Sequence, residues 1–157
     1  MRVIQENLIT TIDSDLITDF PRSFSIDLRV SKSDVDGLGH MNNAVYVNWL
    51  DQAHLYHLFN LGITMDVMKT CQRGLVVRHS EVDYLSALQE NDLVRVGTCV
   101  ASCDGKLRLC RHFQMVRRND GVTVLRGLID YVCIDYKNGK PRRMPAEFVN
   151  ALVPAVL

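Results

Sequence analysis

One stretch of ten residues holds the groups best suited to chemistry, and it reads Asp34-Val35-Asp36-Gly37-Leu38-Gly39-His40-Met41-Asn42-Asn43. It lies directly before a segment with a helical pattern, so its last residues are predicted to begin a helix. Backbone N–H groups at a helix start have no acceptor within the helix, and the helix dipole favours negative charge there. A carboxylate a few residues upstream could approach a carbonyl group polarised by these donors. These are the groups needed to transfer an acyl group from an activated ester.

A structural explanation competes with the catalytic one for the same residues. Asp34 and Asp36 are of a type common in turns and helix caps, and Gly37 and Gly39 permit tight backbone geometry. A histidine close to a helix start is also common for structural reasons alone. The residues by themselves therefore leave open whether this loop is an active site or a turn.

The elements on either side of the loop determine where its groups can point. Residues 23–30 alternate apolar and polar side chains, which predicts a half-buried strand. A helix is predicted from Asn42 or Asn43 to about Asn60, with an asparagine cap at its start and Gly62 just past its end. Apolar residues cover most of its circumference, so we expect this helix to be largely buried.

Four more strands are predicted after the helix, at about 75–84, 92–102, 106–117 and 122–136, and the last of them is apolar on both faces. A short connection through Cys71 and Gly74 precedes them, and a short tail follows Pro145. The order predicts an α+β fold, in which a single antiparallel sheet curls around one long central helix. Because the helix covers one face of the sheet, the other face or a sheet edge is expected to meet a second subunit. Residues 1–21 show no sustained period and are predicted to be an N-terminal extension, or an edge element, of a single domain at 22–157.

Several other polar residues are candidates for a site, although a structural role explains each of them. Asp51, His54 and His57 follow one another at spacings of three on the predicted helix, which makes a metal site conceivable but favours polar positions on a rim or a subunit interface. Arg111 shares a strand face with apolar residues, and we expect it to reach past an edge to water or to a partner subunit. His79, Glu81 and Asp83 alternate along one strand, as is typical of a solvated face or an interface.

The ten-residue stretch, together with the start of the predicted helix, resembles a known family. Asp36, the glycine-containing turn and then His40-x-Asn42-Asn43-x-x-Tyr46-x-x-Trp49 are similar to the signature of hotdog-fold thioesterases, nearest to the 4-hydroxybenzoyl-CoA and long-chain acyl-CoA thioesterase branches. Glu81 to Ala87 resembles the second strand of that family and its turn, with Ser86 where the family has proline. Val132 to Asp135, followed by Gly139 to Arg142, resembles the closing strand and tail. The resemblance extends over roughly residues 24–148 and implies a hotdog fold.

The resemblance also implies roles for individual residues. Asp36 matches the carboxylate that acts as nucleophile or general base, and the backbone N–H of Asn43 falls where the family polarises the thioester carbonyl. His40 matches a histidine of acyl carrier protein thioesterases, but Leu38 stands where those enzymes have asparagine, which favours an acyl-CoA site. Whether His40 assists the base, orients Asp36 or supports the loop stays open. Gly39 and Tyr46 are expected to contact the substrate.

The implied activity is hydrolysis of acyl-CoA to a free acid and CoA, with a role in fatty acid metabolism. The alternatives are an acyl carrier protein thioesterase, a hotdog dehydratase and a non-catalytic acyl-binding module. The resemblance implies a homodimer, and a dimer of dimers, with sites between subunits and with no metal or other cofactor. An apolar acyl pocket is expected from Leu38, Met41, Val45 and Trp49.

Composition narrows the remaining classes of function. Of 157 residues, 18 are Lys or Arg and 18 are Asp or Glu, so the chain lacks the basic excess of a general nucleic-acid binder. No apolar run approaches the roughly 20 residues of a membrane-spanning helix, and residues 1–12 do not resemble a signal peptide. Five cysteines without a C-x-x-C pair favour a reduced, cytoplasmic protein. Basic residues gather late in the sequence, where the phosphates of CoA could be held or where they simply favour solubility.

Overall fold

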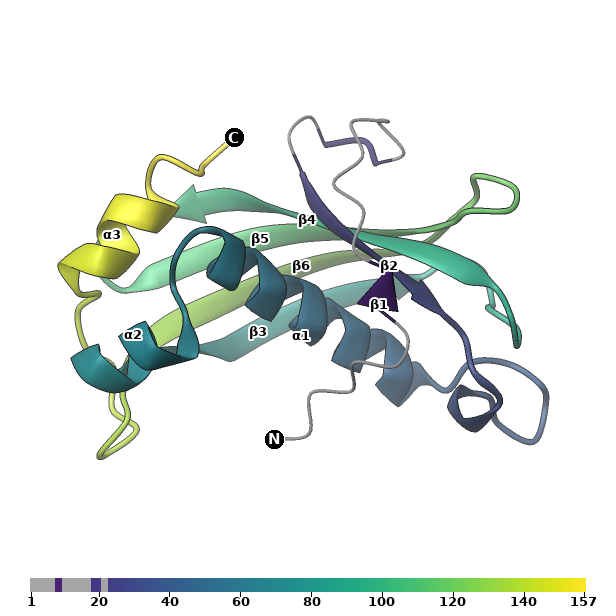
Figure 1. Cartoon of the computed structure of the whole chain (residues 1–157), viewed down its shortest axis with the longest axis horizontal. Coiled ribbons are helices and arrows are strands. Elements are labelled where there is room, and N and C mark those ends of the chain that lie inside the picture. The colour runs from purple at the N-terminus through teal and green to yellow at the C-terminus, as the bar shows by residue number, and fades with distance from the viewer. Residues whose placement is uncertain (1–7, 10–17, 21–22) are drawn as a thin grey trace.

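A computed structural model describes residues 8–9, 18–20 and 23–157 of the chain. Within these residues, six strands form one antiparallel sheet in the order β1-β2-β4-β5-β6-β3, and helix α1 lies across one face of it (Figure 1). This arrangement confirms the predicted α+β architecture. The strands are β1 (Leu8–Ile9), β2 (Phe24–Arg29), β3 (Arg73–Tyr84), β4 (Leu93–Cys103), β5 (Arg108–Arg117) and β6 (Thr123–Asp135).

Most of the predicted N-terminal extension, together with its boundary at residues 21–22, lies outside the described residues. The two residues of β1 add an edge strand next to β2. Residues 18–20 lie against the face of the sheet opposite α1, where Asp19 N–H donates to Gln114 Oε1 at 2.8 Å and the Phe20 ring stacks on His112. A Cβ on Gly97 would lie 2.5 Å from Thr18 Cγ2, so a residue without a side chain is needed at that position.

Helix α1 (Asn43–Asn60) begins and ends where the sequence predicts. The Asn42 side chain accepts a hydrogen bond from Ala44 N–H, and Gly62 follows the helix with a φ of 86°. One face of the helix is buried, and Trp49, Leu50 and Ala53 on it pack into the core. An exposed stripe that includes Val47 and Asp51 remains, so the expectation of burial holds for one face and not for the other.

Two short helices were not predicted. Helix α2 (Met65–Cys71) occupies the place of the expected short connection before β3, and Thr64 Oγ1 caps it by accepting from Val67 N–H. Helix α3 (Ala146–Leu152) occupies the place of the expected tail and buries Phe148 and Leu152. Both helices have seven residues, which is too short for a helical period to stand out in the sequence. A 3-10 helix (Lys32–Asp34) precedes the Asp36 loop.

The sequence predicts that both faces of β6 are covered, but the structure covers only one of them fully. From Gly127 to Asp135 its alternate residues are buried, while the residues between them are only partly covered. The buried set faces α1. Within the described part of the chain, the second face of the sheet is therefore left partly open.

The Arg111 side chain lies in the core and not at an edge of the sheet, so the prediction that it reaches water or a partner is wrong. It is fully buried between β5 and α1. Its guanidinium group donates to His54 Nδ1 at 3.1 Å, to His57 Nδ1, and to Thr98 Oγ1 at 3.3 Å. No carboxylate contacts it in the part of the chain that the structure describes. Burial lowers the pKa of Arg111 to about 10.

His54 and His57 lie on the buried face of α1. The prediction that they lie on a rim or a subunit interface is therefore wrong. His54 stacks on Tyr131 with the ring centroids 4.0 Å apart, and His57 stacks on Phe24 at 5.0 Å. Each Nδ1 accepts a guanidinium hydrogen and therefore carries no proton, so both rings are neutral. Burial, and then the nearby charge of Arg111, lowers the pKa of both rings, to about 3 for His57. A single cation thus fastens two neutral rings of α1 to the sheet.

Neither a metal cluster nor a membrane-spanning helix is found among the described residues. No group of three or more His, Cys, Asp or Glu side chains is arranged to hold a metal ion there. Nor is any helix among them long and apolar enough to span a membrane.

Candidate active site

The Asp36 carboxylate is held by a turn that closes within five residues. Its Oδ1 accepts a hydrogen bond from Leu38 N–H at 2.8 Å and from His40 N–H at 3.3 Å. The backbone is fixed in the same way, because Asp36 N–H donates to His40 O at 2.8 Å and Gly39 N–H donates to Asp36 O at 3.0 Å. Asp36 itself is exposed, and its Oδ2 accepts no hydrogen bond from the described residues. One carboxylate oxygen thus holds the loop, and the other is free for chemistry.

The backbones of Gly39 and His40, and not the His40 ring, form this turn. Gly39 has a φ of 78°, a conformation that side chains disfavour, which explains the need for glycine there. His40 meets Asp36 through its N–H and not through its ring, and no contact of the ring is present within residues 8–9, 18–20 and 23–157. The backbone N–H of His40 therefore helps to hold the Asp36 carboxylate, and the role of the His40 side chain stays a prediction. Assistance to the base would fall to its exposed ring.

The start of α1 presents one unsatisfied donor beside this turn. Asn42 Oδ1 accepts from Ala44 N–H at 3.0 Å, and Val45 N–H donates to Asn42 O at 2.9 Å. The N–H of Asn43 meets no acceptor among the residues that the structure describes. It lies in the first turn of an 18-residue helix, where the helix dipole favours negative charge. The Asn43 amide is thus available to polarise a carbonyl oxygen.

The turn and the helix start line one cavity of about 480 Å³. The lining residues come from the turn, from the first turn of α1, and from the end of β3 with its following loop: Asp36, His40, Met41, Asn42, Asn43, Tyr46, Tyr84, Leu85, Ser86 and Ala87. Asp36, His40, Asn43 and Tyr46, which the sequence placed in the site, therefore share one cavity. Gly39 contributes to the turn but does not line the cavity.

The second wall of this cavity was not predicted as part of the site. Tyr84, Leu85, Ser86 and Ala87 form it, and the N–H groups of Leu85 and Ser86 both donate to Val124 O. The resemblance marked this segment only as a strand and turn. Its match to a turn of the thioesterase family was the one signal in the sequence that could have revealed it.

Several residues expected in the acyl pocket lie elsewhere. Of the four apolar residues predicted there, Met41 lines the cavity, whereas Leu38 is 83% exposed and Val45 and Trp49 do not line it. Helix α1 turns Trp49 into the hydrophobic core, where its side chain contributes to packing. Asp51 also lies outside the cavity lining, on the exposed stripe of α1.

Tyr46 connects the two walls of the cavity. Its hydroxyl accepts a hydrogen bond from Leu88 N–H at 3.0 Å, and its ring meets Tyr84 edge-on with the centroids 5.4 Å apart. Burial raises the pKa of the Tyr46 hydroxyl. Met41 N–H donates to Leu88 O at 2.8 Å, so both polar groups of the Leu88 backbone are bound by residues of the first wall.

Tyr46→Phe is expected to lower the free energy of unfolding by about 1–2 kcal/mol, because the buried Leu88 N–H loses its acceptor. Urea denaturation followed by circular dichroism measures this change. Tyr56→Phe is the matched control on the same helix, since no hydrogen bond of the Tyr56 hydroxyl is found in the described part of the chain. Equal losses in the two variants would show that the Leu88 contact contributes nothing.

A family model matches most of this chain. The model describes a thioesterase-like superfamily, and the match extends over residues 30–152, which includes the Asp36 turn, α1 and both cavity walls. Among curated proteins, no sequence matches the chain significantly.

Solved structures show the same fold at low sequence identity. A 1,4-dihydroxy-2-naphthoyl-CoA thioesterase from Synechocystis is 17% identical, with a TM-score of 0.73 over 83% of this chain and 95% of its own. A Staphylococcus aureus protein solved in complex with CoA is 17% identical, with a TM-score of 0.78 over 87% of each chain. A DHNA-CoA thioesterase, also from Staphylococcus aureus, is 21% identical, with a TM-score of 0.71 over 77% of this chain and 80% of its own.

Proposed function

The chain belongs to the thioesterase-like superfamily and is a thioester hydrolase, and from this premise we propose that it hydrolyses acyl-CoA with Asp36 as its essential carboxylate. One observation supports the proposal most strongly. The same cavity is lined by a carboxylate with one oxygen that accepts no hydrogen bond from the described residues and by the residue whose helix N–H has no acceptor among them. Asp36 and Asn43, which lie at opposite ends of one short loop, line the same cavity of about 480 Å³. A carbonyl placed between them meets both a base or nucleophile and an oxyanion donor.

Asp36 can act by either of two balanced routes. In the first, Oδ2 attacks the thioester carbon, the C–S bond breaks, CoA leaves as thiolate, and water then cleaves the resulting mixed anhydride. In the second, Oδ2 takes a proton from water as that water attacks the same carbon, and the thiolate leaves from the tetrahedral intermediate. In both, the Asn43 N–H stabilises the oxyanion. A thiol pKa near 8.5 makes the thiolate a ready leaving group, so the site needs no strong acid.

We assign CoA as the carrier because the sequence departs from the acyl carrier protein motif at Leu38. The same fold occurs in a protein solved with CoA and in two aryl-CoA thioesterases, which supports this assignment and adds aryl acyl groups to the candidates. The five cysteines are free thiols, in agreement with the proposed cytoplasmic location.

The partner that we propose is a second copy of the chain, joined along β3. This strand has 12 residues and pairs only with β6 in the described part of the chain, and residues Val76 to Glu81 along it are exposed. The unpaired N–H and C=O groups of such a long open edge can pair with a strand of another chain. Pairing of β3 with its copy would place each cavity, which Tyr84 lines at the end of β3, at a subunit boundary. A further pairing of such dimers is part of the same proposal.

A panel of short, medium, long and aryl acyl-CoAs tests the activity. We expect one acyl class to be hydrolysed with kcat/KM at least about tenfold above the others, because the cavity has one fixed shape. The free acid is measured by chromatography, since five protein thiols interfere with thiol-reactive dyes. If no member of the panel is hydrolysed while an acyl carrier protein thioester is, the carrier assignment is wrong.

A further inference from the structure

The second wall of the cavity leaves the sheet at Tyr84, which is the last residue of β3. The next two N–H groups, of Leu85 and Ser86, both donate to Val124 O, at 2.9 and 3.3 Å. Ala87 N–H meets no acceptor among the residues that the structure describes. The sheet therefore holds the near end of this wall but not its far end.

The peptide unit at the far end of the wall is bound on both sides. Its oxygen, Ala87 O, accepts a hydrogen bond from Arg117 Nη1 at 3.0 Å, and its nitrogen, Leu88 N–H, donates to the Tyr46 hydroxyl at 3.0 Å. Because a peptide unit is planar, contacts on its two sides fix its orientation as well as its position. Met41 N–H donates to the next carbonyl, Leu88 O, at 2.8 Å. A cation on β5 and a phenol on α1 thus hold this peptide unit between them.

The guanidinium group of Arg117 is itself held by two carboxylates. Its Nε donates to both oxygens of Asp120, at 3.1 and 3.0 Å, and its Nη1 lies 3.9 Å from Asp92 Oδ2. The Arg117 side chain is 19% exposed, which limits the access of competing water. A charged donor also makes a stronger hydrogen bond than a neutral one. Arg117 is therefore a fixed support of Ala87 O and not a freely moving surface side chain.

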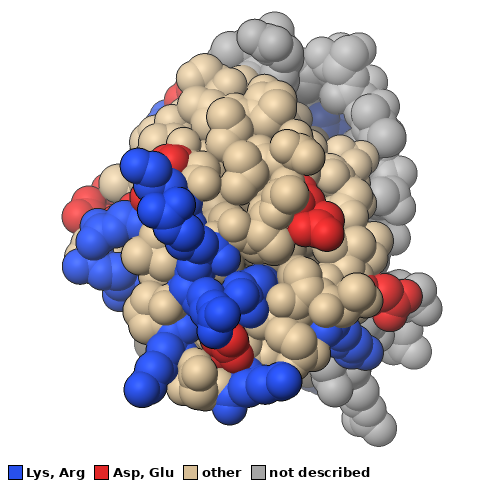
Figure 2. Space-filling model, turned by 90° about the vertical axis from the view of Figure 1, so that its left-hand side faces the viewer, with Lys and Arg blue, Asp and Glu red and all other residues tan. Residues whose placement is uncertain are grey.

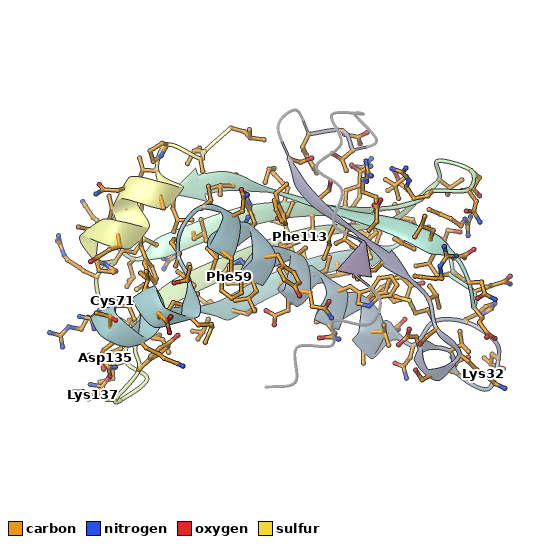
Figure 3. The ribbon with its side chains drawn as sticks, viewed as in Figure 1. Lys32, Phe59, Cys71, Phe113, Asp135 and Lys137 are labelled. Carbon is orange, nitrogen blue, oxygen red and sulfur yellow. The ribbon has the colours of Figure 1, made fainter. Side chains whose placement is uncertain are left out.

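Arg117 lies at the end of the molecule that holds the cavity. It is the last residue of β5, and the turn after it lies at the same end of the sheet as the loop before α1 (Figure 1). Lys32, in the 3-10 helix before the Asp36 loop, marks this end in Figure 3, with Lys137 at the other end. Figure 2 shows that other end, on which Lys and Arg side chains gather. Arg117 is therefore separate from that charged surface and lies beside the candidate site.

We propose that Arg117 is a positioning residue, which determines how the acyl group fits by holding the peptide unit between Ala87 and Leu88. This inference rests on the proposed hydrolysis of acyl-CoA. Asp36 and Asn43 are held by the turn and by the start of α1, so the loss of Arg117 displaces only the second wall. A displaced wall changes the fit of each acyl group and the placement of its thioester. Arg117 thus acts on the choice of acyl group and not on the chemistry at Asp36.

The first test measures Arg117→Gln on the acyl-CoA panel. The glutamine amide ends where the arginine Nε lies, so it can still donate to Asp120 but does not reach Ala87 O. The acyl preference is the ratio of kcat/KM for the best acyl class to that for the next class. We expect this ratio to fall from about tenfold or more in the wild type to about threefold or less. An unchanged ratio, or an equal loss of kcat/KM for every class, would overturn the proposal.

Asp120→Asn is the matched control for this variant. Its Oδ1 still accepts from Arg117 Nε and from Val122 N–H, as Asp120 does. Both variants break the ion pair, but only Arg117→Gln loses the donor to Ala87 O. We expect Asp120→Asn to keep the acyl preference within about twofold of the wild type, because a partly exposed ion pair contributes little. The same loss in both variants would assign the effect to the turn between β5 and β6 and overturn the proposal.

The second test follows hydrogen exchange of the Leu88 amide and needs no substrate. This N–H is bound to the Tyr46 hydroxyl in a fully buried residue, so it exchanges when the wall opens. We expect exchange to be about tenfold faster or more in Arg117→Gln, and within about threefold of the wild type in Asp120→Asn. Wild-type exchange in Arg117→Gln would overturn the proposal. Failure of the proposed function is recognised separately, as a wild-type protein that hydrolyses no member of the panel.

Discussion

Asp36→Asn is expected to lower kcat by about 100-fold or more, which corresponds to roughly 2.7 kcal/mol of activation free energy. Asparagine keeps an Oδ1 atom that can accept from Leu38 N–H and His40 N–H, so the turn should survive the substitution. It replaces the free Oδ2 with an amide nitrogen, which can neither attack a thioester nor accept a proton from water. The loss therefore measures chemistry and not folding. Initial rates on the best acyl-CoA of the panel, with thermal unfolding of both proteins as a check on the fold, give the comparison.

Asp51→Asn is the matched control for this experiment. Asp51 is the other carboxylate that the sequence offers near the site, and it lies on the exposed stripe of α1 outside the cavity lining. We expect its variant to keep kcat within about threefold of the wild type, because its carboxylate does not line the cavity. If Asp51→Asn loses activity and Asp36→Asn keeps it, the essential carboxylate is on the helix and the turn is structural.

Acid is expected to destabilise the protein strongly through His57. The unfolded chain binds a proton at this residue near its ordinary pKa of 6.5, whereas the pKa in the folded protein is about 3. Between these two values the unfolded state binds more protons, so the free energy of unfolding falls as the pH falls. The full difference corresponds to about 4–5 kcal/mol of stability that is present above pH 6.5 and lost on the way to pH 3. His54, whose pKa is lowered in the same direction, adds to the loss.

Urea midpoints measured at pH 7, 5.5 and 4 check this expectation, and His57→Asn isolates the contribution of one ring. The asparagine Oδ1 can accept from Arg111 in place of Nδ1 but cannot take up a proton. The variant should therefore lose stability less steeply with falling pH, by up to about 1.4 kcal/mol per pH unit. His79→Asn is the control, because His79 is exposed. Identical pH slopes for wild type and His57→Asn would show that the buried ring does not carry the effect.

The sequence predicted most of the fold because its long elements have clear periods. The alternation in β2, the caps of α1 and the glycine turns between strands each depend on residues that are close together in the sequence. The structure has all three features where they are predicted. The helices α2 and α3 were missed because seven residues give too little periodicity to identify a helix. Their formation depends on a threonine cap in one case and on packing of Phe148 into the core in the other.

Only the part of the candidate site whose residues are close together in the sequence was predicted. The turn and the helix start lie within eight residues of each other, so spacing brought Asp36 and Asn43 together. The second wall comes from the end of β3, about 40 residues later, and only the register of β3 on β6 brings it to the cavity. The burial of Arg111 could not be predicted for the same reason. Its two histidine partners lie on α1, and no pattern near Arg111 in the sequence indicates that they accept its hydrogen bonds.

The Asp36 turn is closed by its own backbone, and this has a consequence for how the family can change. Among the described residues, all the hydrogen bonds that the carboxylate accepts come from Leu38 and His40. The opposite wall, at Leu85 to Ala87, is built on a different element and meets the first wall through Leu88 and Tyr46. Substitutions or insertions in that wall can reshape the space for an acyl group while the carboxylate keeps its geometry. Selectivity and reactivity can thus evolve separately, and a new substrate preference need not be preceded by a loss of catalysis.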